Sequence, residues 1–175
     1  MSIFQFLAEN LYIVLALTGI LGLCVGSFLN VVIHRTPLIM NREWRKDTAW
    51  FLDTQSDLDP THVKPIGKVI ASDAPISLSF PPSRCPKCNH QIRAYENIPI
   101  ISWLILLHGK CSDCGNPISM RYPLVELITA LLSVLVIYML GANVAGVLGL
   151  IYLWILIALT GIDFDTQLLP DRLVF

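Results

Sequence analysis

The sequence predicts an all-α polytopic membrane protein in which three transmembrane helices flank one small cytoplasmic domain. Of its 175 residues, 54% are hydrophobic and 14% are charged, and the mean hydropathy is +0.63. Since soluble domains carry about 25% charged residues, most of this chain is expected to lie in lipid. Eleven of the 12 Lys and Arg residues fall between Arg35 and Arg121, which places the polar domain between apolar helices.

The first helix is expected to run from Leu11 to about Ile33, because these 23 residues carry no charge. A spanning helix needs about 20 residues to cross roughly 30 Å of hydrocarbon. A cleaved signal peptide would show a basic segment before a shorter apolar core and a small-residue cleavage site after it, and this pattern is not evident. We therefore interpret residues 1–34 as a retained transmembrane helix with its N-terminus outside.

Two further helices are expected over Pro123–Leu140 and over Val144–Ile162. Basic residues follow the first helix and precede the second, whereas the loop GANVAG between the second and third has none. The positive-inside rule therefore predicts that residues 35–122 lie in the cytoplasm. A third crossing then returns the chain to the cytoplasmic side at Asp163, so that this aspartate and the polar domain share one side of the membrane.

The first part of the polar domain, residues 36–80, shows no sustained helical or alternating period. Its several prolines predict a loop-rich insertion, with short strands around Lys68–Ser72 and Ile76–Phe80. Its function is not evident from the sequence.

The second part carries two CxxC pairs, CPKC and CSDC, separated by 22 residues. Such knuckles turn both thiolates toward one ion, and two knuckles supply the four sulfurs of a closed tetrahedral zinc site. Two disulfides or a thioredoxin-like redox pair are the alternatives. A cytoplasmic location disfavours stable disulfides, and no βαβ pattern surrounds either pair. We predict a structural zinc ion bound by four ligands: Cys85, Cys88, Cys111 and Cys114.

The first helix also contains polar and small residues on one face. Ser27 and Asn30 are three residues apart, beside Gly26. Small residues let helices approach closely, and an amide in lipid must face protein or water. Two interpretations stay open, a helix–helix contact and a surface that faces substrate.

Three aspartates follow the last apolar run. Asp165 is explained by a position at the water interface, and Asp171 after Pro170 fits the first turn of a new helix. Asp163 follows the apolar run almost directly. An ionisable residue at that depth is a candidate for function.

Three patches occur in an order that resembles one protein family. They are GSFLNVVIHRTP at Gly26–Pro37, a central patch running from CPKC through ENIPIISWL and GKCSDCGNPIS to RYPLVE, and GIDFDTQLLPD from Gly161. Together they resemble the bacterial type IV prepilin leader peptidases/N-methyltransferases of pilus and type II secretion systems. The match runs in patches that are spread over most of the chain, and their combination is far more specific than any one of them.

The resemblance implies a multi-pass aspartic protease of the bacterial inner membrane. It would remove the leader from prepilins and pseudopilins on the cytoplasmic side and then N-methylate the new N-terminus with S-adenosylmethionine. Asp163 matches the family's first catalytic aspartate, which opens the D-x(6)-P-D pattern, and residues 123–175 would hold two transmembrane helices and the start of the catalytic region. The four cysteines match the family's tetracysteine motif. No nucleic-acid partner is expected, and the methyl-donor site is not located.

The chain departs from the family in one respect, since the GxGD motif that carries the second catalytic aspartate does not occur in it. Asp165 is a poor substitute, because positions i and i+2 do not face each other on a helix. We therefore expect the N-terminal portion of such an enzyme, inactive by itself. The alternative is a non-catalytic, zinc-bearing membrane scaffold of a pilus or secretion assembly, and a redox protein is a third option.

Overall fold

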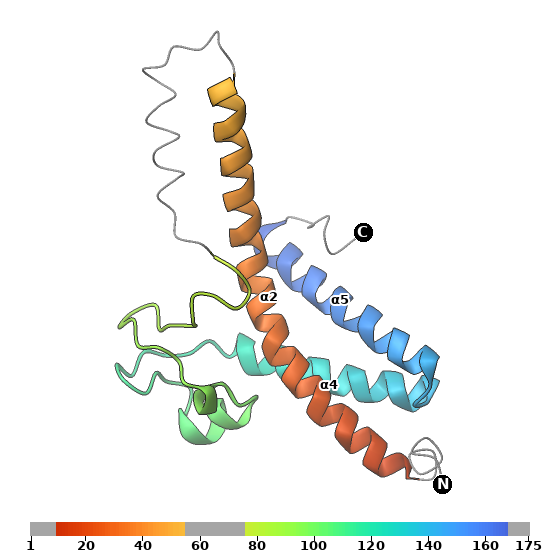
Figure 1. The fold of residues 1–175 in the computed structure, drawn as a ribbon. Coiled ribbons are helices and arrows are strands. Elements are labelled where there is room, and N and C mark those ends of the chain that lie inside the picture. Colours follow the sequence, from red (N-terminus) through yellow and green to blue (C-terminus); the bar gives the residue numbers. More distant parts are fainter. Residues whose placement is uncertain (1–9, 55–75, 168–175) are drawn as a thin grey trace.

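The computed structural model describes residues 10–54 and 76–167, and its regular elements are helices (Figure 1). Among the described residues no strand forms, and β-type pairing is limited to two isolated bridges. The predicted all-α class is thus confirmed. The elements in chain order are α2 (Leu11–Thr54), the short helical turns η1 (Ala94–Asn97) and η2 (Ser102–Leu106), α4 (Arg121–Leu140) and α5 (Val144–Thr166).

Three of these helices, α2, α4 and α5, are long and apolar enough to cross a membrane, as predicted. Short-range signals set their ends. Gly141, with a φ of 78°, stops α4 in a conformation that favours glycine. Asn143 then caps α5, because its side-chain oxygen accepts the backbone N–H of Gly146 over 3.0 Å. The chain is a multi-pass membrane protein.

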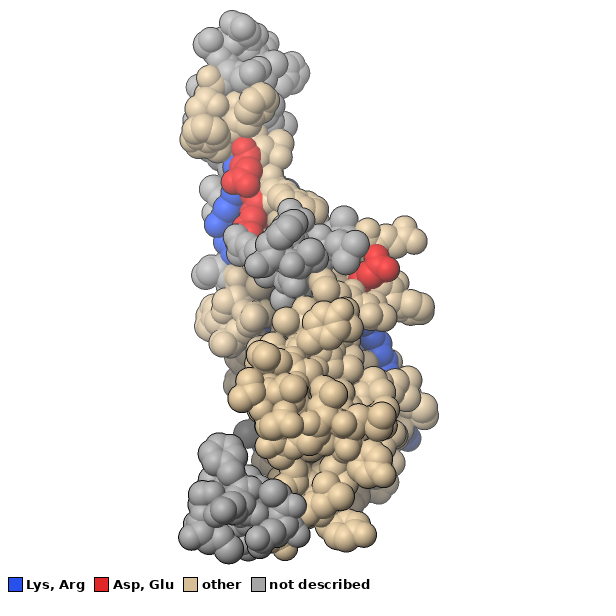
Figure 2. Space-filling model, turned by 90° about the vertical axis from the view of Figure 1, so that its right-hand side faces the viewer, with Lys and Arg blue, Asp and Glu red and all other residues tan. Residues whose placement is uncertain are grey.

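Helix α2 continues well past the apolar run and ends at Thr54. The loop-rich structure predicted for residues 36–80 is therefore wrong for residues 36–54. Its 44 residues extend about 66 Å at 1.5 Å per residue, roughly twice the hydrocarbon thickness. Figure 1 shows the far half of α2 projecting beyond the other two spans, and charged side chains lie along that half in Figure 2. Large apolar side chains such as Trp50 and Phe51 are exposed there. A helix exposed on most sides has no single apolar stripe, so its sequence shows no period.

The strand expected at Ile76–Phe80 is also absent: residues 78–80 form a bend, and the two residues before them have no regular structure. The guanidinium of Arg35 organises this stretch by donating to the carbonyls of Ser77, Leu78 and Pro81 at 3.0, 3.2 and 2.7 Å. The strand expected at 68–72 lies outside the described residues. The division of the chain into domains at 1–34, 35–122 and 123–175 stays a prediction.

Helices α2 and α4 pack closely because glycines line their contact. A methyl group added at Gly22 would lie 2.7 Å from the Cα of Ala130, and one added at Gly26 would lie 2.7 Å from the Cα of Glu126. Both distances are too short for a real Cβ. The expected role of Gly26 in close helix approach is therefore confirmed.

Polar side chains inside the bundle are satisfied within it. Thr129 and Ser133 are fully buried on α4, and the Ser133 hydroxyl donates to the Thr129 carbonyl over 2.6 Å. Trp154 of α5 donates its indole N–H to the Ser133 oxygen over 2.9 Å. A hydroxyl without a partner would be costly here, because lipid offers no hydrogen-bond partner. These hydrogen bonds supply the partners, and the one between Trp154 and Ser133 also joins α5 to α4.

Candidate functional site

The four predicted ligands come together in one cluster. The sulfurs of Cys85, Cys88, Cys111 and Cys114 all lie within 4.8 Å of one another. Cys85 and Cys114 are 3.7 Å apart, and Cys88 and Cys111 are 3.9 Å apart. Four sulfurs at about 2.3 Å from one zinc ion in a tetrahedron would be separated by about 3.8 Å. The cluster therefore fits a tetrahedral metal ion, whereas disulfide sulfurs would be about 2.05 Å apart.

The two knuckles have the same backbone path. In the first, the N–H of Asn89 donates to the Cys85 carbonyl over 3.0 Å, and in the second Gly115 donates to Cys111 over 3.0 Å. Asn89 and Gly115 have φ values of 61° and 67°, a conformation that Asn and Gly adopt most readily. These turns bring each CxxC pair of sulfurs to one side. The fifth cysteine, Cys24, lies on α2 and is outside the cluster.

Two cysteines of the cluster, Cys85 and Cys88, differ in the pKa of their thiols. Backbone N–H groups of Cys88 and Lys87 stabilise the Cys85 thiolate and lower its pKa to about 6. The N–H of His90 acts in the same direction on Cys88, but partial desolvation and the neighbouring sulfurs outweigh it and raise the pKa of Cys88 to about 12. Four adjacent thiolates would repel one another, so a cation is needed to hold all four in that form.

A buried carboxylate links the two knuckles, and sequence reasoning missed it. Glu96 accepts the N–H of Arg93 over 2.8 Å and the hydroxyl of Ser112 over 2.6 Å, and its oxygen lies 3.4 Å from Nε2 of His90. The Arg93 N–H and the Ser112 hydroxyl hold the pKa of Glu96 below its usual range, although burial opposes them. The sequence signals this contact only weakly, because the residue three positions before Glu96 is Arg93 and not the Ser or Thr that begins a capping box.

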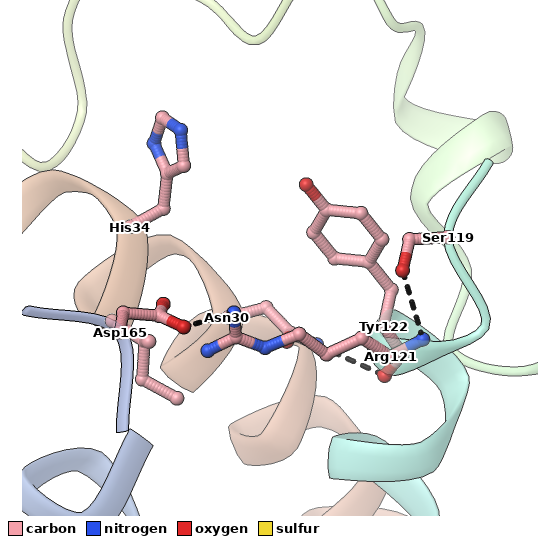
Figure 3. Close-up of a pocket in the computed structure, with 7 residues that line it drawn as sticks. Asn30, His34, Ser119, Arg121, Tyr122 and Asp165 are labelled. Atoms are coloured by element: carbon pink, nitrogen blue, oxygen red, sulfur yellow. Dashed lines mark hydrogen bonds and ion pairs between the residues drawn. The ribbon is translucent and has the colours of Figure 1, made fainter. Parts of the chain in front are cut away.

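A second feature lies where α4 begins and α5 ends, which we call the polar end of the bundle. Arg121 Nη1 lies 2.6 Å from Asp165 Oδ1 (Figure 3). Beside this pair, Asn30 of α2 donates its amide to the carbonyl of Tyr122 over 3.0 Å. The three helices thus meet through polar contacts around a cavity of about 160 Å³. Its lining residues are Asn30, Ile33, His34, Ser119, Arg121, Tyr122 and Asp165.

The contacts of Asn30 test the two interpretations of the polar face of the first helix, a helix–helix contact and a surface that faces substrate. Asn30 is buried and joins α2 to α4, so the helix–helix contact is observed. The same residue also borders the cavity, and His34 and Tyr122 stand on opposite sides of it in Figure 3. A structural role for Asn30 therefore does not remove it from the candidate site.

Asp163 lies in the last turn of α5 and has an exposed side chain. Its carbonyl accepts the N–H of Gln167, the residue that ends the helix, over 2.8 Å. Among the described residues its carboxylate has no ion pair, whereas Asp165 is held by Arg121. Residues two apart on a helix point roughly 200° apart, so the two aspartates do not form a pair. Pro170 and Asp171 lie outside the described residues.

Comparison with known proteins finds a matching family profile and similar curated proteins that share one name. The profile of a family described as "Bacterial Peptidase A24 N-terminal domain" matches residues 20–140. Curated relatives named "Prepilin leader peptidase/N-methyltransferase" include proteins from Stutzerimonas stutzeri, 48% identical over 170 residues, and Aeromonas hydrophila, 43% identical over 175 residues. These alignments cover 97% and 99% of this chain but 54% and 56% of the relatives.

A relative of the same name from Dichelobacter nodosus is 48% identical over 158 residues, which cover 89% of this chain and 51% of the relative. The chain thus spans about half the length of the curated relatives it matches. No solved structure matches it.

Proposed function

This chain belongs to the bacterial A24 peptidase family, through its N-terminal domain, and on that premise we propose that it is part of a membrane aspartic endopeptidase. The enzyme would remove the leader peptides of type IV prepilins and pseudopilins and would N-methylate the new N-terminus. The names of the relatives support both activities, and the three apolar helices suit substrates that are themselves membrane proteins.

The observation that carries the proposal is the position of Asp163. Its carboxylate is exposed at the polar end of the bundle, while its neighbour Asp165 is already held by Arg121. A catalytic carboxylate must reach substrate, and a carboxylate engaged by a guanidinium is a poor base. Of the two aspartates on α5, Asp163 is therefore the one that we assign to catalysis.

Aspartic proteolysis needs a second carboxyl group. One carboxylate takes a proton from the attacking water while the other, protonated, donates a hydrogen bond to the scissile carbonyl. Asp165 points to another side of α5, and Glu126 is buried against α2. We propose that the second aspartate is supplied by part of the enzyme beyond these 175 residues.

The four cysteines would hold a structural zinc ion in the proposed enzyme. Four sulfur ligands leave no open position for substrate or water, so the ion would stabilise the fold of residues 84–118 and take no part in the reaction. Each knuckle supplies two sulfur ligands, and sulfurs from different knuckles lie 3.7 and 3.9 Å apart. Both features support zinc.

S-adenosylmethionine is the proposed methyl donor, but we do not assign its site. The cavity at the polar end measures about 160 Å³, whereas ligand pockets are typically about 300–1,000 Å³. The cavity is therefore smaller than a typical cofactor pocket.

We further propose that the polar end faces the cytoplasm of a bacterial inner membrane. Arg35 and Arg121 lie at this end, and cytoplasmic flanks of transmembrane helices are enriched in such residues. The prepilin leader would then meet Asp163 on the same side as the cysteine cluster.

The proposal is tested in cells that carry the full-length enzyme with Asp163→Asn. Mass spectrometry of the pilin N-terminus should show an intact leader and no methylated mature pilin, because methylation requires the new N-terminus. Asp165→Asn serves as the matched control and should leave processing largely intact. Normal processing with Asp163→Asn would contradict the assignment and would favour a scaffold role for this part of the protein.

A further inference from the structure

An uncharged apolar stretch interrupts the polar segment between α2 and α4. It runs from Ile98 to Leu107 as IPIISWLILL and lies between the two cysteine knuckles. Several of its large aliphatic side chains are exposed: among the described residues, Ile101, Leu104 and Ile105 are 51%, 55% and 64% exposed. A contiguous exposed patch of large aliphatic side chains indicates an interaction surface. We call residues 98–107 the apolar turn.

The apolar turn has a fixed shape. Its backbone adopts the left-handed conformation at Ile100, near its start, and at His108, just after its end, with φ values of 57° and 47°. Trp103 points back into residues 84–118, which we call the cysteine module, since its indole donates to the carbonyl of Ile118 over 3.3 Å and its ring lies against Gly109. The aliphatic side chains that follow Trp103 are therefore directed outward by the backbone, and are not parts of a loosely packed core.

A hydrogen bond to α4 fixes the depth of the apolar turn relative to the bundle. The backbone N–H of Ile100 donates to Oε2 of Glu126 over 2.7 Å. Glu126 lies five residues beyond Arg121, the first residue of α4, or about 7.5 Å along the helix at 1.5 Å per residue. Glu126 is itself buried against Gly26 of α2. The apolar turn is thus attached inside the span, below the level of the Arg121–Asp165 pair.

The exposed side of α4 at this depth is also apolar. Leu124, Leu127 and Ile128 are exposed on the same part of α4, by 53%, 44% and 41%. Figure 1 shows the green helical turns of the module next to the first turns of α4. Because α4 crosses the membrane, its exposed aliphatic side chains face lipid, and the apolar turn extends that lipid-facing surface sideways.

We propose that the apolar turn is embedded in the bilayer, with the side chains of residues 98, 101 and 104–106 among lipid acyl chains at the edge of the hydrocarbon layer. Non-helical backbone at membrane depth is tolerated where protein satisfies it, and Glu126 does so for Ile100. The cysteine module is thereby held against the membrane at two points, the bundle through Glu126 and the lipid through the apolar turn. This inference does not depend on the proposed peptidase activity.

Photocrosslinking in native membranes tests the proposal directly. The full-length protein would carry benzoylphenylalanine at position 105 or, as the matched control, at Gln91, an exposed polar position of the same module. After irradiation, mass spectrometry should find phospholipid attached at position 105 and none at position 91. Attachment of a polypeptide at position 105, or no lipid adduct there, would overturn the proposal.

A charge placed in the apolar turn provides a second readout. Ile105→Asp should reduce lipid attachment from benzoylphenylalanine at position 104 by more than about tenfold, because a carboxylate is strongly disfavoured in hydrocarbon. Gln91→Asp adds the same charge at an exposed polar position of the cysteine module and should leave that attachment unchanged. Metal content of each variant establishes that the module has folded. Undiminished lipid attachment in a metal-bearing Ile105→Asp protein would contradict the proposed depth.

Discussion

Arg121 at the start of α4 and Asp165 near the end of α5 form an ion pair in which Nη1 lies 2.6 Å from Oδ1. The two side chains are 40% and 30% exposed, so water and salt screen their attraction. The pair holds the last turn of α5 against the polar end of the bundle, two residues beyond Asp163. The pair should therefore affect function only by positioning the end of α5 that carries Asp163.

We predict a small effect when this ion pair is removed. Asp165→Asn should lower the free energy of unfolding by at most about 1 kcal/mol, since partly exposed pairs contribute about 0.2–1 kcal/mol. Leader cleavage by the full-length enzyme should fall by only a few fold. Exchanging the charges in the double variant Arg121→Asp/Asp165→Arg should recover part of that loss. A complete loss of cleavage in Asp165→Asn would show that this carboxylate, too, takes part in the reaction.

Metal removal should unfold the cysteine module. Structural zinc sites of this kind contribute roughly 10–16 kcal/mol in small domains, so Cys88→Ser should lose the metal and expose residues 84–118 to protease. The measurements are metal content by mass spectrometry and limited proteolysis in membranes. Cys24→Ser is the matched control, because Cys24 lies on α2 outside the cluster. Retention of one metal per chain by Cys88→Ser would contradict a four-cysteine site.

The close contact of α2 with α4 predicts opposite outcomes for two similar substitutions. In Gly26→Ala the new methyl group would meet the Glu126 Cα at 2.7 Å, and overpacking of this kind costs about 1–3 kcal/mol. In Gly19→Ala the nearest atom, Cγ2 of Val134, is at 3.4 Å, an ordinary contact. That variant should be neutral or slightly stabilised, because alanine favours helix. Thermal unfolding in detergent would measure both, and equal stabilities would exclude the tight contact.

Glu96 predicts a pH dependence for the cysteine module. Its pKa is lowered in the folded protein by the Arg93 N–H and the Ser112 hydroxyl, so its ionised form stabilises the fold above the pKa that it has when unfolded. That contribution is lost as the pH falls through the lowered pKa of the folded state.

Wild type should therefore be more stable than Glu96→Gln at pH 7, by roughly 1 kcal/mol, and the difference should shrink below about pH 4.5. Hydrogen exchange of residues 84–118 at pH 7 and pH 4 would measure it in samples that retain their metal at both pH values, because protonation of the thiolates releases the metal and would itself unfold the module. Asp113→Asn, which changes an exposed carboxylate of the second knuckle, should show no such difference. A constant difference between wild type and Glu96→Gln at both pH values would contradict this role of the ionised carboxylate.

The parts of the fold that local sequence determines were predicted well. The apolar runs, Gly141 and Asn143 define the spans, and CxxC pairs with turn-forming neighbours determine the shape of each knuckle. The gathering of four sulfurs was accordingly expected from spacing. Their role as zinc ligands and the role of Asp163 remain predictions.

Contacts between distant segments were not predictable in the same way. The bond between Ile100 and Glu126 joins residues 26 apart, and the Arg121–Asp165 pair joins residues 44 apart. Each depends on how the helices pack, and a single sequence carries no periodic signal for such pairings. The extension of α2 to Thr54 was missed for a different reason, because an exposed helix lacks the apolar stripe by which helices are recognised.

We assign proteolysis at the polar end of the bundle to Asp163, and this assignment makes a kinetic prediction. Its most direct test is the rate of leader removal from a prepilin by the purified full-length enzyme in lipid vesicles, with Asp163→Asn compared with wild type. We predict a fall of at least about 10²–10⁴-fold in kcat/KM with the metal content and thermal stability unchanged. Cleavage at a rate near that of wild type would show that the catalytic carboxylates lie elsewhere.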